Sequence, residues 1–277
     1  MTEIMMTYKP SPKPNFTKPT HIKYTLMETH MWGDEITGKV KDWIYVSNES
    51  LHQIIFGMEA RGNFKHSDQY RTIFGADELM YVLSGVLIIN NPETGETQKI
   101  NKGESVFFRK DTWHHGFNHS DDYLQVLEFF SPPPITGTSG AYAKEKTLLK
   151  KSLYIKKDYD SENNLKNQNT FKIIKNDNLV WRLEGPNQEI LIGTFVNTEF
   201  LKVHIIKLLP NQRTHNFNFL KNTSFLSLNN NVKVNIIDNN DEYILSEKDG
   251  MYLPEKTSFI IENMNSIESN IIFCEGL

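Results

Sequence analysis

The sequence predicts an all-β protein made of two antiparallel barrels in tandem, joined by a polar connector. Its apolar residues form short runs, such as YLQVLEFF at 123–130, bounded by turn-forming residues, as expected for strands. A hairpin signal, NPETG at 91–95, separates two of these runs. The pattern then returns in the second half, where KDGMYLPEKTSFIIEN, ending at Asn263, can be laid over GESVFFRKDTWHHGFN, ending at Asn118.

Length and composition limit the class of protein. A chain of 277 residues with 38% apolar and 12% aromatic residues can bury one large or two ordinary cores, and its length favours two domains of ordinary size. The net charge of -4 predicts no nucleic-acid partner. No run of 18 apolar residues occurs and the first residues lack the apolar core of a signal peptide, so we expect a cytoplasmic protein without a membrane partner. The single cysteine, Cys274, excludes an internal disulfide and is expected to be a buried, inert thiol.

The chain divides into four predicted segments. Residues 1–40 form a proline-rich arm that either wraps the domain or stays mobile. Residues 41–131 form the first barrel, and residues 179–277 form the second. The connector at 132–178 is rich in Gly, Ser, Lys, Asp and Asn and is expected to hold one short helix within 141–151.

The candidate chemical centre lies within residues 78–118. Glu78 starts one predicted strand and His114 lies at the entry to another, so the two could face each other inside a small barrel. A carboxylate and a neutral imidazole suit a divalent first-row metal ion. Inward charges are costly unless they are paired or bound to metal. The alternative is that Glu78 forms a buried salt bridge with Arg71 or Arg109, and that His114 is a hydrogen-bonded core residue.

The start of this stretch resembles the first sequence motif of the cupin superfamily. Glu78, followed after six residues by Gly85, is similar to the end of that motif. The family places a His-x-His pair three or four residues before the glutamate, whereas residues 71–76 here contain no histidine. The nearest substitute is His66-Ser67-Asp68, with a longer insertion and with Asp in place of the second His.

The end of the stretch resembles the second cupin motif. Gly103, His114 and Asn118 lie at the expected intervals, although the family's usual Pro and Gly are here Arg109 and Asp111. The resemblance implies two barrels of the jelly-roll type and a divalent metal, most simply Fe(II), with Mn, Ni or Zn as alternatives. The implied metal ligands are His66, Glu78 and His114, with Asp68 as a fourth.

Other residues of the first half receive weaker assignments. Arg71 is a catalytic and substrate-binding candidate because a guanidinium can hold a substrate carboxylate through two hydrogen bonds. Its alternative is a salt bridge to Asp68 or Asp77. His115 follows His114 on a predicted strand and therefore points to the opposite face, away from the metal. Two aromatic residues are assigned to packing or to the substrate-binding pocket wall: Tyr81 and Trp113. His30 and His52 are expected to be exposed or structurally hydrogen bonded.

The second half looks like a barrel that kept its fold and lost its metal. The overlay places Phe259 where the first half has His114. Continued backwards with a single deletion, it places Ser224 at the position of Glu78 and Asn231 at that of Gly85. We therefore expect an apolar interior that includes Phe259, and an isolated His215.

Two functions from different classes follow. The first is a metal-dependent enzyme for a small oxygen-rich, carboxylate-bearing metabolite. Its chemistry would be of the oxygenase type, or of the isomerase, dehydratase or decarboxylase type with Glu78 or a histidine moving a proton. The second is a non-catalytic bicupin that binds a metabolite or stabilises a dimer without metal. A homodimer is expected in either case, and metal content separates the two functions.

Overall fold

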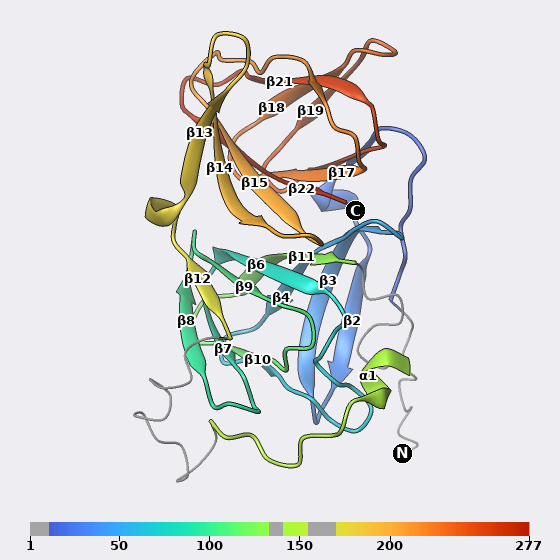
Figure 1. Cartoon of the computed structure of the whole chain (residues 1–277), viewed down its shortest axis with the longest axis vertical. Helices are drawn as coiled ribbons and strands as arrows, with labels where there is room; N and C mark the ends of the chain where they lie inside the picture. The colour runs from blue at the N-terminus through green and yellow to red at the C-terminus, as the bar shows by residue number, and fades with distance from the viewer. Residues whose placement is uncertain (1–10, 133–140, 155–169, 277) are drawn as a thin grey trace.

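The computed structural model describes residues 11–132, 141–154 and 170–276. Two antiparallel barrels lie one above the other along the long axis of the molecule (Figure 1). Each barrel consists of a seven-stranded and a four-stranded sheet, as predicted for tandem jelly-roll barrels. In this part of the chain no helix has the length and apolar character needed to cross a membrane. Parts of the predicted arm (1–10), the connector (133–140 and 155–169) and Leu277 lie outside the described residues.

The N-terminal barrel, barrel 1, pairs its strands in the orders β12-β9-β6-β11-β4-β3-β2 and β5-β10-β7-β8. Its strands are β2 (Thr29–Asp34), β3 (Gly38–Ser47), β4 (His52–Met58), β5 (Asn63–Phe64), β6 (Asp77–Ser84), β7 (Val86–Asn90), β8 (Thr97–Asn101), β9 (Ser105–Phe108), β10 (His115–Asn118), β11 (Leu124–Ser131) and β12 (Lys172–Ile174).

The C-terminal barrel, barrel 2, has the corresponding orders β1-β20-β17-β22-β15-β14-β13 and β16-β21-β18-β19. Its strands are β1 (Thr20–Ile22), β13 (Val180–Glu184), β14 (Ile190–Asn197), β15 (Lys202–Leu208), β16 (Phe217–Asn218), β17 (Thr223–Ser227), β18 (Val232–Ile236), β19 (Asp241–Leu245), β20 (Gly250–Leu253), β21 (Ser258–Asn263) and β22 (Ser269–Glu275). The described helices are short: α1 (Ala141–Glu145) and the 3-10 turns η1 (Tyr24–Leu26) and η2 (Asn176–Asn178).

The two barrels exchange strands, which shifts the predicted domain boundaries. β1, from the N-terminal arm, pairs with β20 of barrel 2. β12, from the connector, pairs with β9 of barrel 1. Barrel 1 also begins before residue 41, because β2 and the start of β3 belong to its large sheet. Described parts of the arm and of the connector therefore contribute strands to the sheets, which composition alone did not reveal.

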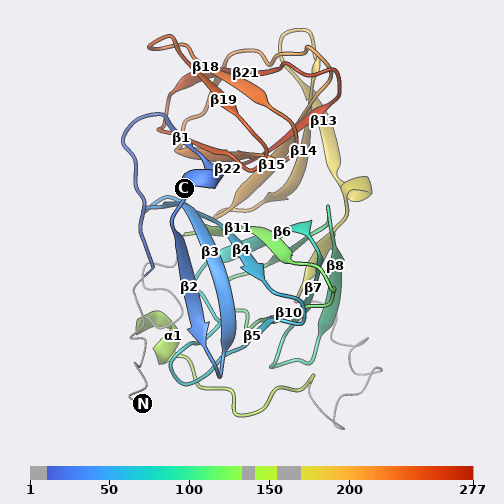
Figure 2. The same cartoon turned by 180° about the vertical axis from the view of Figure 1, so that it is seen from behind.

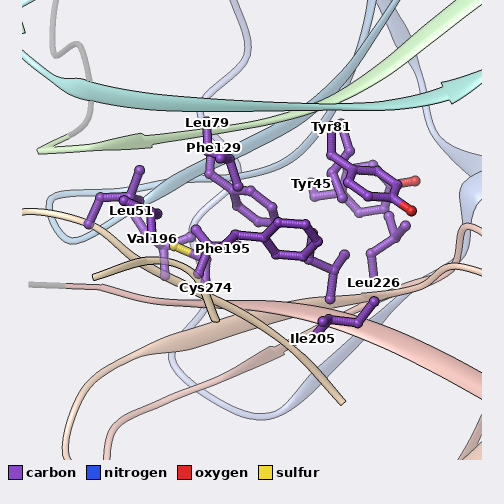
Figure 3. Close-up of a cluster of buried hydrophobic side chains, with 14 of the residues drawn as sticks. Tyr45, Leu51, Leu79, Tyr81, Phe129, Phe195, Val196, Ile205, Leu226 and Cys274 are labelled. Carbon is purple, nitrogen blue, oxygen red and sulfur yellow. The ribbon is translucent and has the colours of Figure 1, made fainter. Parts of the chain in front are cut away.

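The large sheets of the two barrels pack face to face. Side chains alternate along β6, so Met80 and Val82 point into barrel 1 while Leu79 and Tyr81 point towards barrel 2. Figure 3 shows this interface, where Leu79 and Phe129 lie opposite Phe195 and Cys274. Both faces of the sheet are covered, which explains why its strands read as continuous apolar runs. The Cys274 thiol is buried there, as predicted.

The strand register corrects one residue assignment in barrel 2. Phe108 on β9 pairs with Glu78, and its counterpart in the overlay, Leu253, pairs with Thr223. Thr223, not Ser224, therefore occupies the position of Glu78. The same one-residue shift places Asn230 at the position of Gly85, and both have positive φ, 59° and 77°. The halves align here without the deletion that the sequence overlay assumed, and Ser224 points to the interface, where it is hydrogen bonded to Gln53.

Candidate functional site

Glu78 and His114 meet inside barrel 1. Glu78 lies at the start of β6, on the inward-pointing face that continues with Met80. His114 immediately precedes β10, where its amide donates to the carbonyl oxygen of Thr72 at 3.1 Å. The Nε2 atom of His114 is 3.8 Å from Oε2 of Glu78, and the two residues are 2% and 1% exposed. The structure thus brings together two of the predicted ligands.

Aromatic rings surround this pair. The His114 ring centroid lies 5.9 Å from that of Phe64, 5.8 Å from Phe74 and 4.9 Å from Phe108. Burial lowers the pKa of His114 to about 4. Burial also raises the pKa of Glu78 well above its usual value, with smaller contributions from the charges of Glu128 and Asp77. At neutral pH His114 is therefore uncharged, while burial favours the protonated form of Glu78.

The hydrogen bonds of the pair are incomplete. Nδ1 of His114 lies 3.3 Å from the Thr112 carbonyl oxygen, which can only accept, so Nδ1 carries the proton and Nε2 is an acceptor. Oε2 of Glu78 is buried and has no hydrogen-bond partner among the described residues. The 3.8 Å gap to Nε2 is too long for a direct hydrogen bond. An atom at about 2.8 Å from both would bridge them with ordinary hydrogen-bond lengths.

Two further carboxyl groups share this interior, and sequence reasoning missed both. Glu128 on β11 lies on the inward face between Val126 and Phe130, and burial raises its pKa. Asp42 on β3 lies 3.4 Å from Nδ1 of His30, and burial raises its pKa to about 6. The signal was present, because a glutamate interrupts the apolar run of β11 at an inward position.

His66 does not join Glu78 and His114, which corrects the predicted ligand set. Its Nδ1 lies 2.6 Å from Nε2 of His115, and its Nε2 donates to the Leu149 carbonyl oxygen at 2.8 Å. His115 in turn is hydrogen bonded through Nδ1 to the hydroxyl of Tyr154 at 2.5 Å. Because side chains alternate along the strand, His115 points out of the barrel while His114 points in. The structure thus confirms that His115 and His114 point to opposite faces. His66 lies with His115 on the outer side of barrel 1.

The remaining donors do not fit a metal ion of the kind that the family resemblance implies. With three residues before Glu78, the family's two histidines would stand where this chain has Thr72 and Phe74, and Phe74 packs its ring near His114. Asp68 is exposed and lines an outer cavity of about 500 Å³ with His66. Among the described residues no group of three or more His, Cys, Asp or Glu side chains could hold a metal ion.

Arg71 holds the connector in place. Its guanidinium donates to the carbonyl oxygens of Ala143, Lys144 and Lys146, at the C-terminal end of α1. The predicted substrate clamp and the alternative salt bridge to Asp68 or Asp77 are both absent from this geometry. Asp77 instead binds Arg109 at 3.2 Å. Neither arginine therefore neutralises Glu78, which corrects the alternative of a buried salt bridge.

Tyr81 and Trp113 also lie away from the interior of barrel 1. Tyr81 faces barrel 2, where its ring is 5.6 Å from that of Phe195. Trp113 packs with Ile73 and Ala143 beneath α1. Both are packing residues in this structure, and their predicted contact with a pocket in barrel 1 is not present.

Barrel 2 has Thr223 and Phe259 at the positions of Glu78 and His114, so it lacks a carboxyl and imidazole pair there. Its described His21–Asp249 pair, 3.0 Å apart, instead joins β1 to the residue before β20. Phe259 is 1% exposed and stacks on Phe225 with ring centroids 6.0 Å apart in an apolar interior, as predicted. His215 is half-buried and packs its ring on Phe217 at 4.4 Å. The candidate site is thus confined to barrel 1.

Comparison with known proteins shows a domain match in barrel 1 and a shared two-barrel fold. Residues 75–130 match the family model described as Cupin domain. A glyoxylate induced protein from Pseudomonas aeruginosa is similar over 98% of this chain and 93% of its own, with a TM-score of 0.67 and 11% identity. Oxalate decarboxylase of Lactobacillus farciminis, solved as a formate complex, is similar over 95% and 87%, with a TM-score of 0.64 and 13% identity. A search of curated proteins by sequence found no match.

At 11% and 13% sequence identity, these structural similarities show the fold alone. The protein is a two-barrel protein of the jelly-roll type, with the buried Glu78–His114 pair in barrel 1. Residues 75–130 of barrel 1 match the cupin domain model, and the two-barrel fold is similar to that of the oxalate decarboxylase.

Proposed function

We propose that barrel 1 binds a small molecule without a metal ion, through a hydroxyl or amine group that bridges Glu78 and His114. The observation that carries this proposal is the 3.8 Å gap between Oε2 and Nε2, two buried polar atoms that do not bond each other directly. Leaving a buried atom such as Oε2 of Glu78 unsatisfied costs about 1–3 kcal/mol. A bridging ligand atom recovers this free energy.

This proposal departs from a metal-dependent enzyme for a carboxylate substrate. Thr72 and Phe74 replace the histidine pair, and His66 is bonded to His115 outside the barrel. Arg71, the expected carboxylate clamp, binds the end of α1. The resemblance to oxalate decarboxylase supports the fold but supplies neither the donors nor the cation that an acidic substrate needs.

Proton transfer without metal is the second candidate function, favoured by the opposite pKa shifts of the pair. The raised pKa of Glu78 favours its protonated form, and the lowered pKa of His114, about 4, keeps the imidazole a neutral acceptor at neutral pH. Two titratable groups whose environments separate their pKa values can act as acid and base on one bound group.

Metal content tests the first part of the proposal. The purified protein would be analysed for Fe, Mn, Ni and Zn before and after dialysis against a chelator, together with His114→Ala. We expect substoichiometric metal and an unchanged melting temperature after chelation. The matched control is His215→Ala, at a half-buried histidine of barrel 2. One equivalent of metal that is lost in His114→Ala but retained in His215→Ala would overturn the proposal.

Ligand binding tests the second part. Native mass spectrometry of the freshly purified protein would show any small molecule that copurifies. Calorimetric titration with 1-butanol, n-butylamine, butyrate and oxalate supplies defined probes. We expect at least one hydroxyl or amine probe to bind, and binding to be lost in Glu78→Gln and in His114→Phe. Binding that survives both substitutions would place the ligand elsewhere.

A further inference from the structure

We infer that the ligand of barrel 1 is a small cation that donates hydrogen bonds, a primary amine in its ammonium form. This rests on the proposed function and narrows the hydroxyl-or-amine group to one chemical class. The argument has three parts: the hydrogen-bond roles of the pair, the charges around it, and the rings that enclose it.

The pair needs a donor to both of its atoms. Nε2 of His114 accepts, because Nδ1 donates its proton to the Thr112 carbonyl oxygen. Oε2 of Glu78 is 99% buried at the residue level, lacks a partner among the described residues and faces Nε2. An ammonium group donates one N–H to each atom once Glu78 has lost its proton. Binding therefore releases the Glu78 proton to solvent, and no other bond changes.

The charges of the interior favour a cation. On the neighbouring strands β11 and β6, Glu128 lies opposite Met80. Phe130, two residues after Glu128 on the same face of β11, lies opposite Glu78. The two carboxyl groups are therefore diagonal neighbours on adjacent strands. Asp42 points into the same interior from β3. The buried residues of the described chain include no lysine or arginine to balance these carboxyl groups. An ammonium ion stabilises the charged forms of these carboxyl groups, whereas an anionic ligand disfavours those forms further and finds no buried lysine or arginine among the described residues.

The enclosing rings favour the same class. Phe64, Phe74 and Phe108 surround His114, and Phe130 lies 5.3 Å from Phe74. The negative faces of aromatic rings attract a desolvated cation. An organic ammonium ion is attracted both by carboxylates and by the faces of aromatic rings, whereas an alcohol or a carboxylate gains no cation–π attraction.

Calorimetry tests the inference with four probes of similar size: n-butylamine, 1-butanol, butyrate and choline. We expect n-butylamine to bind about tenfold or more tightly than 1-butanol, a difference well within calorimetric range. Choline carries charge without an N–H donor and should bind more weakly than n-butylamine. Repeating the titration in two buffers of different ionisation enthalpy should show proton release. No proton release, or equal affinity for the alcohol and the amine, would overturn the inference.

A variant separates this inference from the proposed function. Glu128→Gln keeps the shape of the protonated side chain. It should weaken the binding of n-butylamine and leave the affinity for 1-butanol unchanged. Glu255→Gln, on an exposed glutamate of barrel 2, is the control and should change neither. If 1-butanol is the better ligand and still requires Glu78, the proposed function stands and the cation inference fails. If no probe requires Glu78, the proposed function fails as well.

Discussion

Burial disfavours the charged forms of the ionisable residues inside barrel 1. Burial is the largest cause for each: it raises the pKa of Glu78, Glu128 and Asp42 and lowers that of His114. Carboxyl groups whose pKa is raised by folding contribute stability that is lost as the pH rises. A histidine whose pKa is lowered by folding contributes stability that is lost as the pH falls. Single substitutions can separate these two opposite pH dependences of stability.

Glu128→Gln should gain stability relative to the wild type as the pH rises. Folding raises the pKa of Glu128, so its protonated carboxyl group contributes fully to stability at any pH below its pKa in the unfolded chain. This contribution is lost as the pH rises through its pKa in the folded chain. Glutamine mimics the protonated form and does not titrate. We expect the difference in unfolding free energy to shift by about 1–3 kcal/mol in favour of the variant between pH 5 and pH 9. Urea unfolding at three pH values measures it.

Glu255→Gln serves as the control for this series, because Glu255 is exposed. Its difference from the wild type should stay flat across the same range. A flat difference for Glu128→Gln as well would mean that the carboxyl group is not protonated in the folded protein.

His114→Phe should gain stability relative to the wild type as the pH falls. The pKa of His114 is about 4 in the folded chain, against 6.5 as its ordinary value, so protonation favours unfolding between these limits. We expect a relative gain of up to about 3 kcal/mol between pH 7 and pH 4. Denaturant unfolding checks it, with His119→Gln at an exposed histidine as the control. A gain of equal size in the control would contradict the assignment.

At the scale of elements, the connector crosses barrel 1 and is held by side chains that the sequence suggested for chemistry. Figure 2 shows α1 and the chain that follows it running beneath the small sheet. Arg71 binds the end of α1, Asp111 binds Lys146 at 2.7 Å, and Tyr154 binds His115. These contacts explain why Arg71 and His66 are absent from the interior, since both serve the outer side of the barrel.

Arg71→Ala should release α1. The substitution removes the hydrogen bonds to the carbonyl oxygens of Ala143, Lys144 and Lys146 that end the helix. We expect faster amide exchange over 141–146 and faster tryptic cleavage after Lys144. Arg61→Ala is the control, because Arg61 pairs with Asp121 on the exposed surface, where ion pairs contribute little. Unchanged exchange in Arg71→Ala would show that the helix is held by packing alone.

Ile22→Pro should detach β1 from barrel 2. Proline lacks the amide proton that an antiparallel ladder uses, and Ile22 pairs with Gly250. We expect a lower melting temperature and faster amide exchange over 250–253, at the edge that β1 covers. Ile22→Val keeps the amide and most of the packing, so it should behave like the wild type. If the proline variant leaves exchange on β20 unchanged, β1 does not protect that edge in solution.

At the scale of the whole molecule, the two barrels share one apolar interface and exchange one strand each. The interface cluster includes Leu79 and Phe129 from barrel 1 with Ile205 and Ile272 from barrel 2. Asp77 also reaches across, where it accepts a hydrogen bond from Thr198 at 2.9 Å. Barrels joined in this way should unfold together.

Phe129→Ala should destabilise both barrels at once. Removal of this fully buried ring leaves a cavity at the interface and costs about 3–5 kcal/mol. Scanning calorimetry should show one transition in the wild type and one, at lower temperature, in the variant. Separate amide-exchange probes in β6 and β15 should report the same loss. Two transitions in the wild type would show that the barrels fold independently.

The repeat of strands and turns was readable from the sequence because alternating apolar residues and turn formers are local signals. The inward direction of Glu78 and His114 was also readable, since a strand alternates its faces. The position of His66 was not readable, because it depends on the path of the insertion between β5 and β6. Thr223 was missed for a related reason, since strand pairing, and not letter similarity, sets the register.

The sequence by itself determined that the chain forms two antiparallel barrels and that the first carries a buried carboxyl and imidazole, because these follow from periodicity within single strands. The tertiary structure alone decided which groups meet. It placed Glu128 near Glu78 and Asp42 near Glu128, and it turned His66 and Arg71 outward to the connector. It also exchanged β1 and β12 between the barrels. These outcomes depend on contacts between residues far apart in the chain, which no local pattern encodes.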